Sequence, residues 1–350
     1  MKKKKKKYGL MLAILATAIV ITCFIMVKDG AGKSGLQITK TGEVPGDIIY
    51  TYGHPLNSPS EVVWIKDGHY QHHTILKGAI GIGYIQADKK GNLWTPSTRN
   101  NKLYKLTPDY KVETSTTPGQ TQKFKIIEGA RISSHSSGDR NYHLLNYVSE
   151  AKSFQMKLEG FLREFTKEGD KLYIFADLIA KEKSVLYVLD IPSEKVINTI
   201  PLPEGVADDM VVYQDKVVLA TKTSLTVVDR SDWKVSTVKL SYPDVRPVSL
   251  YNRNGHLYVA LRSDVDLSGL KLIKMDSNFK EISKVDLGIV HSGGDQFKDD
   301  KYYVYSGEGD PEKKFSGELS VYQLDTWEKI GSLILPIGPK KFNVSGFTVL

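Results

Sequence analysis

A small set of histidine and carboxylate side chains carries the chemistry that this sequence could perform. His291 together with Asp208 or Asp209 could transfer protons to and from a bound substrate, as the general acid and base of a lyase or hydrolase do. Other charged side chains could hold a polar ligand through ion pairs and hydrogen bonds. These candidate ligand-binding residues are Arg163, Arg246, Asp295 and Lys341.

The same residues also fit a simpler interpretation, in which charged side chains line a water-filled channel without catalysis. Asp208 and Asp209 are adjacent in the sequence. In a regular strand they would point to opposite faces, so only one of them could reach a shared site. No active-site motif and no cofactor-binding motif surrounds these residues. We therefore expect a binding function rather than an enzyme, and no cofactor.

Two further clusters resemble metal sites without completing one. Zinc needs its ligands to converge at about 2 Å. Along a strand, His69 and His73 of the sequence HYQHH would lie about 13 Å apart, since each residue rises about 3.3 Å. Asp264 and Asp266 resemble the start of a calcium loop, but the glycine and the distal glutamate of that loop are absent. We expect no metal site.

The elements that must position these residues are seven short β-rich units. The clearest unit, Val185 to Pro203, reads VLYVLDIPSEKVINTIPLP: an apolar strand ends at Asp190, a polar turn follows, and a second apolar strand begins. Equivalent positions recur at 67, 107, 149, 190, 229, 276 and 325. A strand-built repeat of about 40 to 45 residues is typical of a β-propeller. The sequence therefore predicts an all-β, seven-bladed propeller with four-stranded blades. Six or eight blades are the alternatives, because the strands of the third unit, around Gln122–Leu158, can be drawn in two ways.

The blade boundaries can be predicted in detail. In the fifth unit we expect strands at 205–213, 216–220, 225–229 and 233–240. The first unit begins at its second strand, Asp47–Tyr52, so the C-terminal segment Asn343–Leu350 should supply its innermost strand and close the ring. Gly78–Gly83, GAIGIG, should form the innermost strand of the second blade, where small residues fit near the axis.

Over Asp47 to Leu350 the repeat resembles that of the YVTN-type β-propellers, which are close to the quinoprotein-like and WD-repeat superfamilies. The resemblance rests on the aspartate after the third strand and on the Lys-Val pair that opens the fourth, as in LYVLDIPSEKVINTIPLP. It implies a propeller. Families of this shape include bacterial surface and binding proteins, lyases, lactonases and quinone-dependent dehydrogenases. None of their catalytic residues can be transferred, because no active-site motif of theirs is present here.

The N-terminus predicts a membrane anchor. Residues 1–7 form a basic head, and Tyr8–Val27 is a run of twenty residues without a charge. A helix of that length spans roughly 30 Å, which matches the apolar core of a bilayer. The lysines should stay in the cytoplasm and place the C-terminal part outside. A cleaved signal ending near Ala16–Ala18 and a lipoprotein modified at Cys23 remain alternatives. Residues 28–46 should form a flexible tether before the propeller at 47–350.

The net charge of +8 belongs to this head rather than to the propeller. Lys2–Lys7 account for six of the 48 basic residues, which leaves 42 against 40 acidic ones. A nearly neutral folded part gives no electrostatic reason to bind nucleic acid. We expect a monomeric, single-pass protein of the cell membrane. Its propeller would act outside the cytoplasm as a binding or assembly module for a protein, a peptide or a cell-envelope component.

Overall fold

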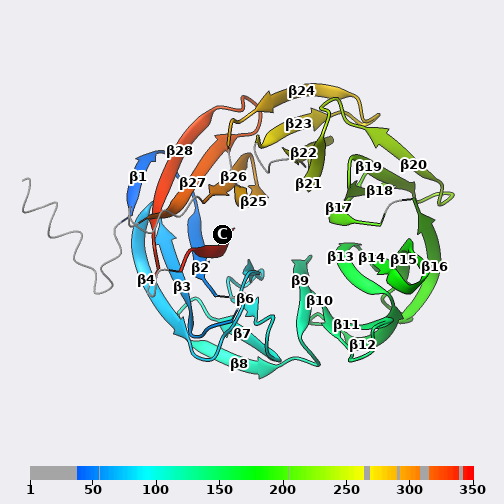
Figure 1. The fold of residues 1–350 in the computed structure, drawn as a ribbon, viewed down its shortest axis with the longest axis horizontal. Coiled ribbons are helices and arrows are strands. Elements are labelled where there is room, and N and C mark those ends of the chain that lie inside the picture. The colour runs from blue at the N-terminus through cyan, green and yellow to red at the C-terminus, as the bar shows by residue number, and fades with distance from the viewer. Residues whose placement is uncertain are drawn as a thin grey trace, which may run out of the picture.

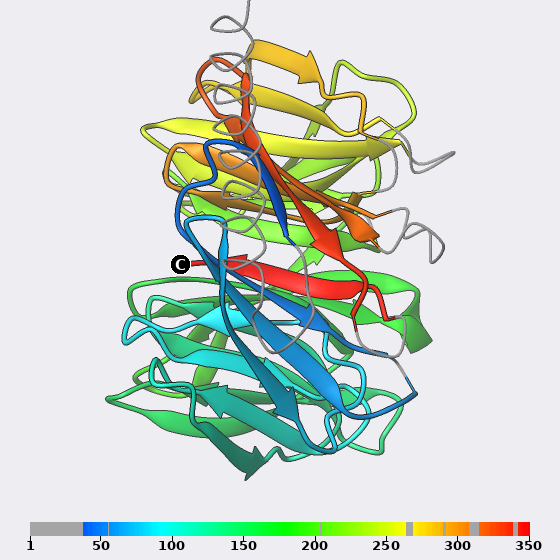
Figure 2. The same cartoon turned by 90° about the vertical axis from the view of Figure 1, so that its left-hand side faces the viewer.

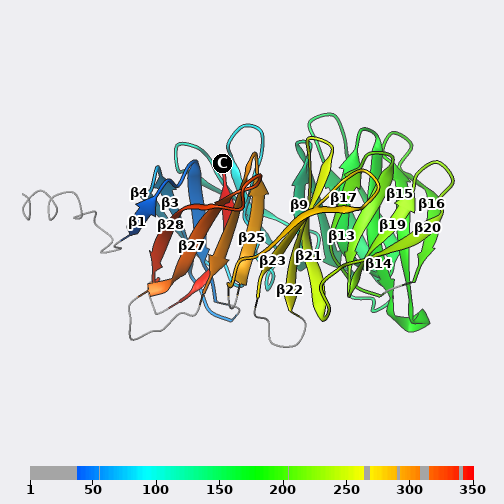
Figure 3. The ribbon, with the colours of Figure 1, turned by 90° about the horizontal axis from the view of Figure 1, so that it is seen from above.

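The computed structural model describes residues 38–54, 56–203, 205–263, 269–289, 292–307, 315–338 and 342–350. In this part of the chain, the strands form seven antiparallel sheets that surround a common axis (Figure 1). Six of these sheets have four strands and one has five. The prediction of an all-β, seven-bladed propeller is therefore confirmed. Seen edge-on, the strands of every blade run between two faces of the ring (Figure 3).

Each blade steps outward from an innermost strand at the axis. The innermost strands, from blade 1 to blade 7, are β29 (Val344–Val349), β5 (Gln86–Ala87), β9 (Thr121–Ile127), β13 (Phe161–Glu168), β17 (Ala207–Tyr213), β21 (Val245–Arg253) and β25 (Ser292–Lys298). The second strands are β2 (Asp47–Tyr52), β6 (Leu93–Pro96), β10 (Ala130–Ser136), β14 (Lys171–Leu178), β18 (Lys216–Thr221), β22 (His256–Ser263) and β26 (Lys301–Ser306).

The outer half of each blade is built in the same way. The third strands are β3 (Ser60–Lys66), β7 (Lys102–Leu106), β11 (Tyr142–Val148), β15 (Lys183–Asp190), β19 (Ser224–Asp229), β23 (Lys271–Met275) and β27 (Phe315–Gln323). The outermost strands are β4 (His69–Leu76), β8 (Val112–Thr116), β12 (Ser153–Glu159), β16 (Lys195–Leu202), β20 (Val235–Lys239), β24 (Glu281–Asp286) and β28 (Lys329–Pro336). A short 3-10 helix, η1 (Ile179–Lys181), joins β14 to β15.

The ring closes through the C-terminal segment, as the sequence predicts. β29 pairs antiparallel with β2, with Val349 opposite Ile48 and Phe347 opposite Tyr50. Figure 2 shows this last strand, in red, beside the blue N-terminal strands. Without it, the inner edge of β2 would expose unpaired backbone groups. We call the face at which the innermost strands begin the entry face, and the opposite face the exit face.

Part of the segment expected as a tether, residues 28–46, belongs to the propeller. Thr39–Gly42 forms strand β1, which pairs with the outer edge of β28 and makes blade 7 five-stranded. Gly42 has a φ of 63°, and a Cβ atom at this position would lie 2.3 Å from the carbonyl oxygen of Ile330. Only glycine fits such a close approach of two backbones without strain. The segment thus joins the ring at its outer edge.

The innermost strand of blade 2 differs from the prediction. Gly78–Gly83 does not form a strand, and the innermost strand is the short β5 that follows it. Gly78 and Gly81 have φ values of 75° and 66°, which a regular β ladder does not contain. The carbonyl oxygen of Gly81 accepts a hydrogen bond of 2.8 Å from the Thr98 hydroxyl instead of pairing with a strand.

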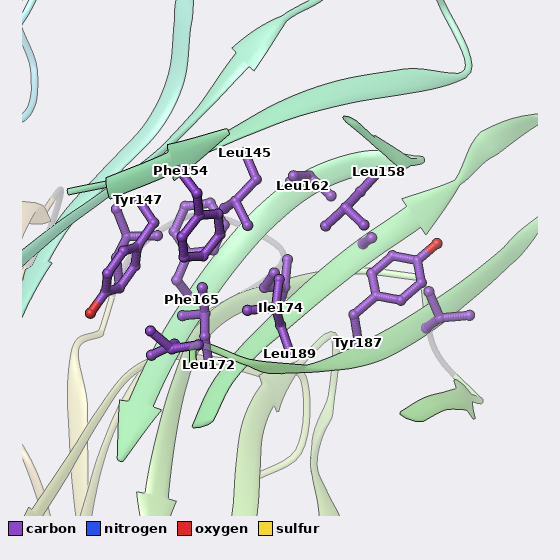
Figure 4. Packing of buried hydrophobic residues seen from close by; sticks show 14 of the residues in the cluster. Leu145, Tyr147, Phe154, Leu158, Leu162, Phe165, Leu172, Ile174, Tyr187 and Leu189 are labelled. Carbon is purple, nitrogen blue, oxygen red and sulfur yellow. The ribbon is translucent and has the colours of Figure 1, made fainter. Parts of the chain in front are cut away.

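The hydrophobic core lies between neighbouring blades. One cluster joins blades 3 and 4, where Leu145 and Phe154 meet Phe165, Ile174 and Leu189 (Figure 4). Both faces of these sheets are covered, so the second and third strands of a blade are apolar on both sides. The core is therefore distributed around the ring, and each blade depends on its neighbours for burial.

Several predicted features lie outside the described residues. They are the apolar run Tyr8–Val27, Cys23, Asp264, Asp266, His291 and Lys341. Among the residues that are described, no helix has the length and apolar character that a crossing of the bilayer demands.

Candidate functional site

A β-bulge near the start of most innermost strands decides where their charged side chains point. In the described part of the chain, six innermost strands skip one residue in their pairing with the second strand. The skipped residues are Gln122, Arg163, Asp208, Val248, Gly293 and Ser345. A bulge bends its strand and redirects the side chains next to it. Two charged candidates, Arg163 and Asp208, occupy this position in adjacent blades.

Arg163 lies at the entry face and forms an ion pair with the buried carboxylate of Asp177. Its Nε donates a hydrogen bond to Asp177, which also accepts one of 2.9 Å from the Ser184 hydroxyl. The guanidinium carbon lies 4.8 Å from the centre of the Phe161 ring, so the cation stacks on an aromatic face. Asp177 is 9% exposed, whereas Arg163 is 40% exposed. The carboxylate thus lies behind the cation, and the cation faces solvent.

Asp208 and Arg246 form an ion pair between blades 5 and 6. Arg246 donates from Nη2 to Asp208 Oδ1 over 2.6 Å and from Nε to Oδ2. This two-point geometry holds both carboxylate oxygens in the plane of the guanidinium. Both side chains are part-buried.

The neighbouring Asp209 has a different set of partners. Its Oδ1 accepts a hydrogen bond of 2.8 Å from Lys125 Nζ, and its Oδ2 accepts one of 2.8 Å from the backbone nitrogen of Leu250. Lys125 also contacts Glu164, which is fully buried and which Lys123 contacts as well. Burial alone would lower the pKa of Lys125, but the Asp209 and Glu164 carboxylates raise it above its ordinary value. This network ties blades 3, 4, 5 and 6 together.

The entry face is hollowed where these strands begin. A pocket of about 210 Å³ brings three of the predicted residues together. The residues that line it include Tyr84, Lys123, Phe161, Arg163, Asp208 and Arg246. A second hollow of about 480 Å³ shares Phe161 and is also lined by His143 and Ile179. We call the first of these the mouth pocket.

Asp295 is not part of the mouth pocket. It lines a cavity of about 670 Å³ together with Lys89 and Lys298 near the ends of the innermost strands. Burial raises its pKa, and Arg262 Nη2 lies 3.5 Å from its Oδ1. The structure thus separates Asp295 from Arg163, Asp208 and Arg246.

Three members of the inter-blade network, Lys123, Lys125 and Glu164, are not among the residues predicted from the sequence. One signal was available, because Lys123 and Lys125 flank Phe124 in a strand with alternating character, and Glu164 interrupts the apolar run of β13. A charge in an innermost strand indicates a partner on the next blade, since a buried charge without one would be costly.

The histidine cluster lies on β4, as the sequence predicts. His73 Nε2 lies 2.6 Å from Glu61 Oε2, and His72 stacks on Tyr110 with 4.0 Å between the ring centres. Within the described residues, no three His, Cys, Asp or Glu side chains converge in a way that could hold a metal ion. These histidines contact other side chains of the propeller.

Neither a protein-family model nor a curated protein sequence matches this chain. Solved structures do match it. Dihydro-heme d1 dehydrogenase NirN superimposes with a TM-score of 0.56 and 11% identity, over 87% of this chain and 75% of NirN. The similarity is one of fold.

Two other structures extend this comparison. Virginiamycin B lyase from Staphylococcus aureus gives a TM-score of 0.52 with 13% identity, over 86% of this chain and 99% of the lyase. The apocarotenoid oxygenase of Synechocystis gives 0.57 with 10% identity, over 93% and 98%. Proteins with different activities thus share this fold, and the arrangement of strands by itself assigns no reaction.

Proposed function

We propose that this protein is a membrane-anchored, extracytoplasmic propeller that binds a protein, peptide or cell-envelope component at its entry face without transforming it. The observation that carries this proposal is the pairing of the carboxylates. Both oxygens of Asp208 accept hydrogen bonds from Arg246, and both oxygens of Asp209 accept from Lys125 and Leu250. Each carboxylate thereby holds a cation of another blade in place, and a rigid array of charged groups of this kind suits the binding of a polar ligand.

The surface beside the mouth pocket supports a binding role. Ile179 projects from η1 and is 63% exposed, next to the hollow that Phe161 and His143 line. An exposed apolar side chain at the rim of a hollow suits contact with a partner. β1 pairs with the outermost strand of blade 7, so the chain joins the ring at its rim rather than over its axis.

Site-specific crosslinking of the full chain in native membranes tests this proposal. A photo-reactive amino acid at Ile179 should give a discrete crosslinked adduct. The matched control is Ile197 on β16, which is 51% exposed on the outermost strand of the same blade and should give none. Equal labelling from both positions, or no adduct from Ile179, would contradict a partner at the entry face.

A further inference from the structure

The mouth pocket is surrounded by more cations than carboxylates. Lys123, Arg163 and Arg246 line it, and among their carboxylate partners only Asp208 lines it with them. The partners of Lys123 and Arg163, which are Glu164 and Asp177, are 0% and 9% exposed and lie behind them. Lys123 and Arg163 thus line the pocket with their carboxylate partners behind them, whereas Arg246 is paired within the pocket.

Arg163 retains donors for a ligand. A guanidinium has five N–H groups, and in the described part of the chain only the Nε of Arg163 makes a hydrogen bond, to Asp177. Its two Nη groups are therefore available. Because the side chain is fixed by Asp177 on one edge and by Phe161 on its face, little side-chain entropy remains to be lost on binding.

Phe161 supplies an apolar surface next to these donors. The ring contacts two side chains, with the Arg163 guanidinium carbon 4.8 Å from its centre and the tilted His143 ring 4.2 Å away between centres. Burial and the nearby Arg163 cation lower the pKa of His143, so its imidazole is neutral near pH 7. His143 Nδ1 has no hydrogen-bond partner among the described residues. A ligand reaching from the pocket over Phe161 would meet an apolar ring and then a neutral polar group.

We propose that the mouth pocket binds an organic oxyanion, a carboxylate or a phosphate, whose attached planar or apolar group lies along Phe161. The anion would accept hydrogen bonds from the Nη groups of Arg163, with Lys123 and Arg246 adding positive charge. Bidentate binding of this kind is the preferred geometry between arginine and a carboxylate or phosphate. The inference rests on the proposed binding function and names the chemistry of its ligand.

Binding of small aromatic anions to the purified full chain in detergent tests the oxyanion proposal. Benzoate should bind, whereas benzamide, which has nearly the same shape without the charge, should bind at least tenfold more weakly, as followed by ligand-observed NMR. Phenyl phosphate separates the two sources of the anion: tighter binding than benzoate indicates a phosphate ligand, and weaker binding a carboxylate. Equal binding of benzoate and benzamide would overturn the proposal.

Substitutions in the mouth pocket show whether benzoate binds there. Arg163→Gln should weaken benzoate binding by about tenfold, since a charged hydrogen-bond pair is lost. Arg163→Lys keeps the charge, so it should fall between wild type and Arg163→Gln. The matched control is Arg230→Gln, which breaks the ion pair with Glu168 away from the mouth pocket and should leave binding unchanged. If Arg163→Gln does not fold, benzoate binding is measured with Arg163→Lys and Phe161→Leu instead. Weaker binding by both variants than by the wild type supports the proposal. Binding that no pocket variant weakens would contradict the inference.

The outcomes of the two experiments are separable. A crosslinked partner at Ile179 without selective benzoate binding would keep the proposed function and reject the oxyanion. Benzoate binding that depends on Arg163, without a crosslinked macromolecule, would keep the oxyanion pocket and reject a protein partner.

Discussion

At the scale of single residues, neighbours in the sequence acquire different roles because a bulge separates them. Asp208 is skipped in the pairing of β17 and lines the mouth pocket, whereas Asp209 resumes the ladder and pairs with Lys125. A regular strand would place these two side chains on opposite faces of the sheet. The bulge instead gives each carboxylate its own cationic partner on another blade. Substitution of Asp208 should therefore not have the same effect as substitution of Asp209.

Asp209→Asn should destabilise the protein by about 2 kcal/mol, because Lys125 loses a charged partner in a part-buried network. Urea unfolding at neutral pH measures the change. The control is Glu150→Gln, which removes an ion pair with Lys90 in which both side chains are exposed, and it should leave stability nearly unchanged. Equal effects of the two substitutions would show that the network contributes nothing beyond a surface pair.

A substitution at His291 distinguishes the enzymatic alternative from the proposed binding function. If the enzymatic alternative holds, His291→Ala should abolish turnover of a lactone, ester or glycosidic substrate and leave the melting temperature nearly unchanged. We expect no such turnover from the wild-type full chain. Enzyme-like rates with any of these substrates would contradict the proposed function, whatever the variant does.

At the scale of elements, the turn between the third and outermost strands explains the repeat seen in the sequence. The recurring aspartate caps this turn: Asp229 accepts hydrogen bonds from the backbone nitrogen and hydroxyl of Ser231, and Asp190 does the same with Ser193. These bonds stabilise the charged form of the carboxylate. An aromatic residue with a left-handed backbone follows in four of these turns, namely Tyr110, Trp233, Phe279 and Trp327.

Asp229 should make stability depend on pH. The hydroxyl and backbone bonds of Ser231, with help from Lys216, lower the pKa of Asp229 to about 2. A lowered pKa means that the contribution is present above the unfolded value of about 4 and is lost as the pH falls towards 2. The stability difference between wild type and Asp229→Ala should therefore shrink over this range in urea unfolding. A constant difference from pH 6 to pH 2 would contradict the role of the charge.

Trp327 occupies the left-handed position of the same kind of turn in blade 7. Its φ is 61°, its ring lies 5.9 Å from that of Tyr258 on the preceding blade, and its Nε1 donates to Ser283 over 3.3 Å. Trp327→Ala should cost about 2 kcal/mol through lost packing. Trp327→Gly should cost about 1 kcal/mol less than Ala, because glycine adopts the left-handed conformation freely. Thermal unfolding of both variants checks this order, and the reverse order would exclude backbone strain at this turn.

At the scale of the whole molecule, closure by β29 makes the ring a single unit. Its pairing with β2 joins the last strand to the first complete blade, so every blade has two neighbours to pack against. Removal of residues 344–350 should leave the inner edge of β2 unpaired and expose apolar surface of blades 1 and 7.

A chain truncated after Asn343 should melt at a lower temperature and associate through the exposed edge. Light scattering after size exclusion would detect the association. A synthetic peptide of residues 343–350, added in trans, should restore the melting temperature towards that of the full chain. An unchanged melting temperature of the truncated chain would show that closure contributes little to stability.

The sequence by itself determined the propeller fold, the closing segment and the nearly neutral charge of the propeller, and it favoured seven blades but misplaced the innermost strand of the second. These features follow from local apolar alternation and turn residues that repeat with a constant period, as at Asp190 and Asp229. Only the tertiary structure decided which charged residues meet. Arg163, Asp208 and Arg246 come together, and Asp295 is set apart, because bulges redirect side chains and because partners lie on neighbouring blades about 40 residues away in sequence. Such contacts depend on how sheets pack, and no local pattern encodes them.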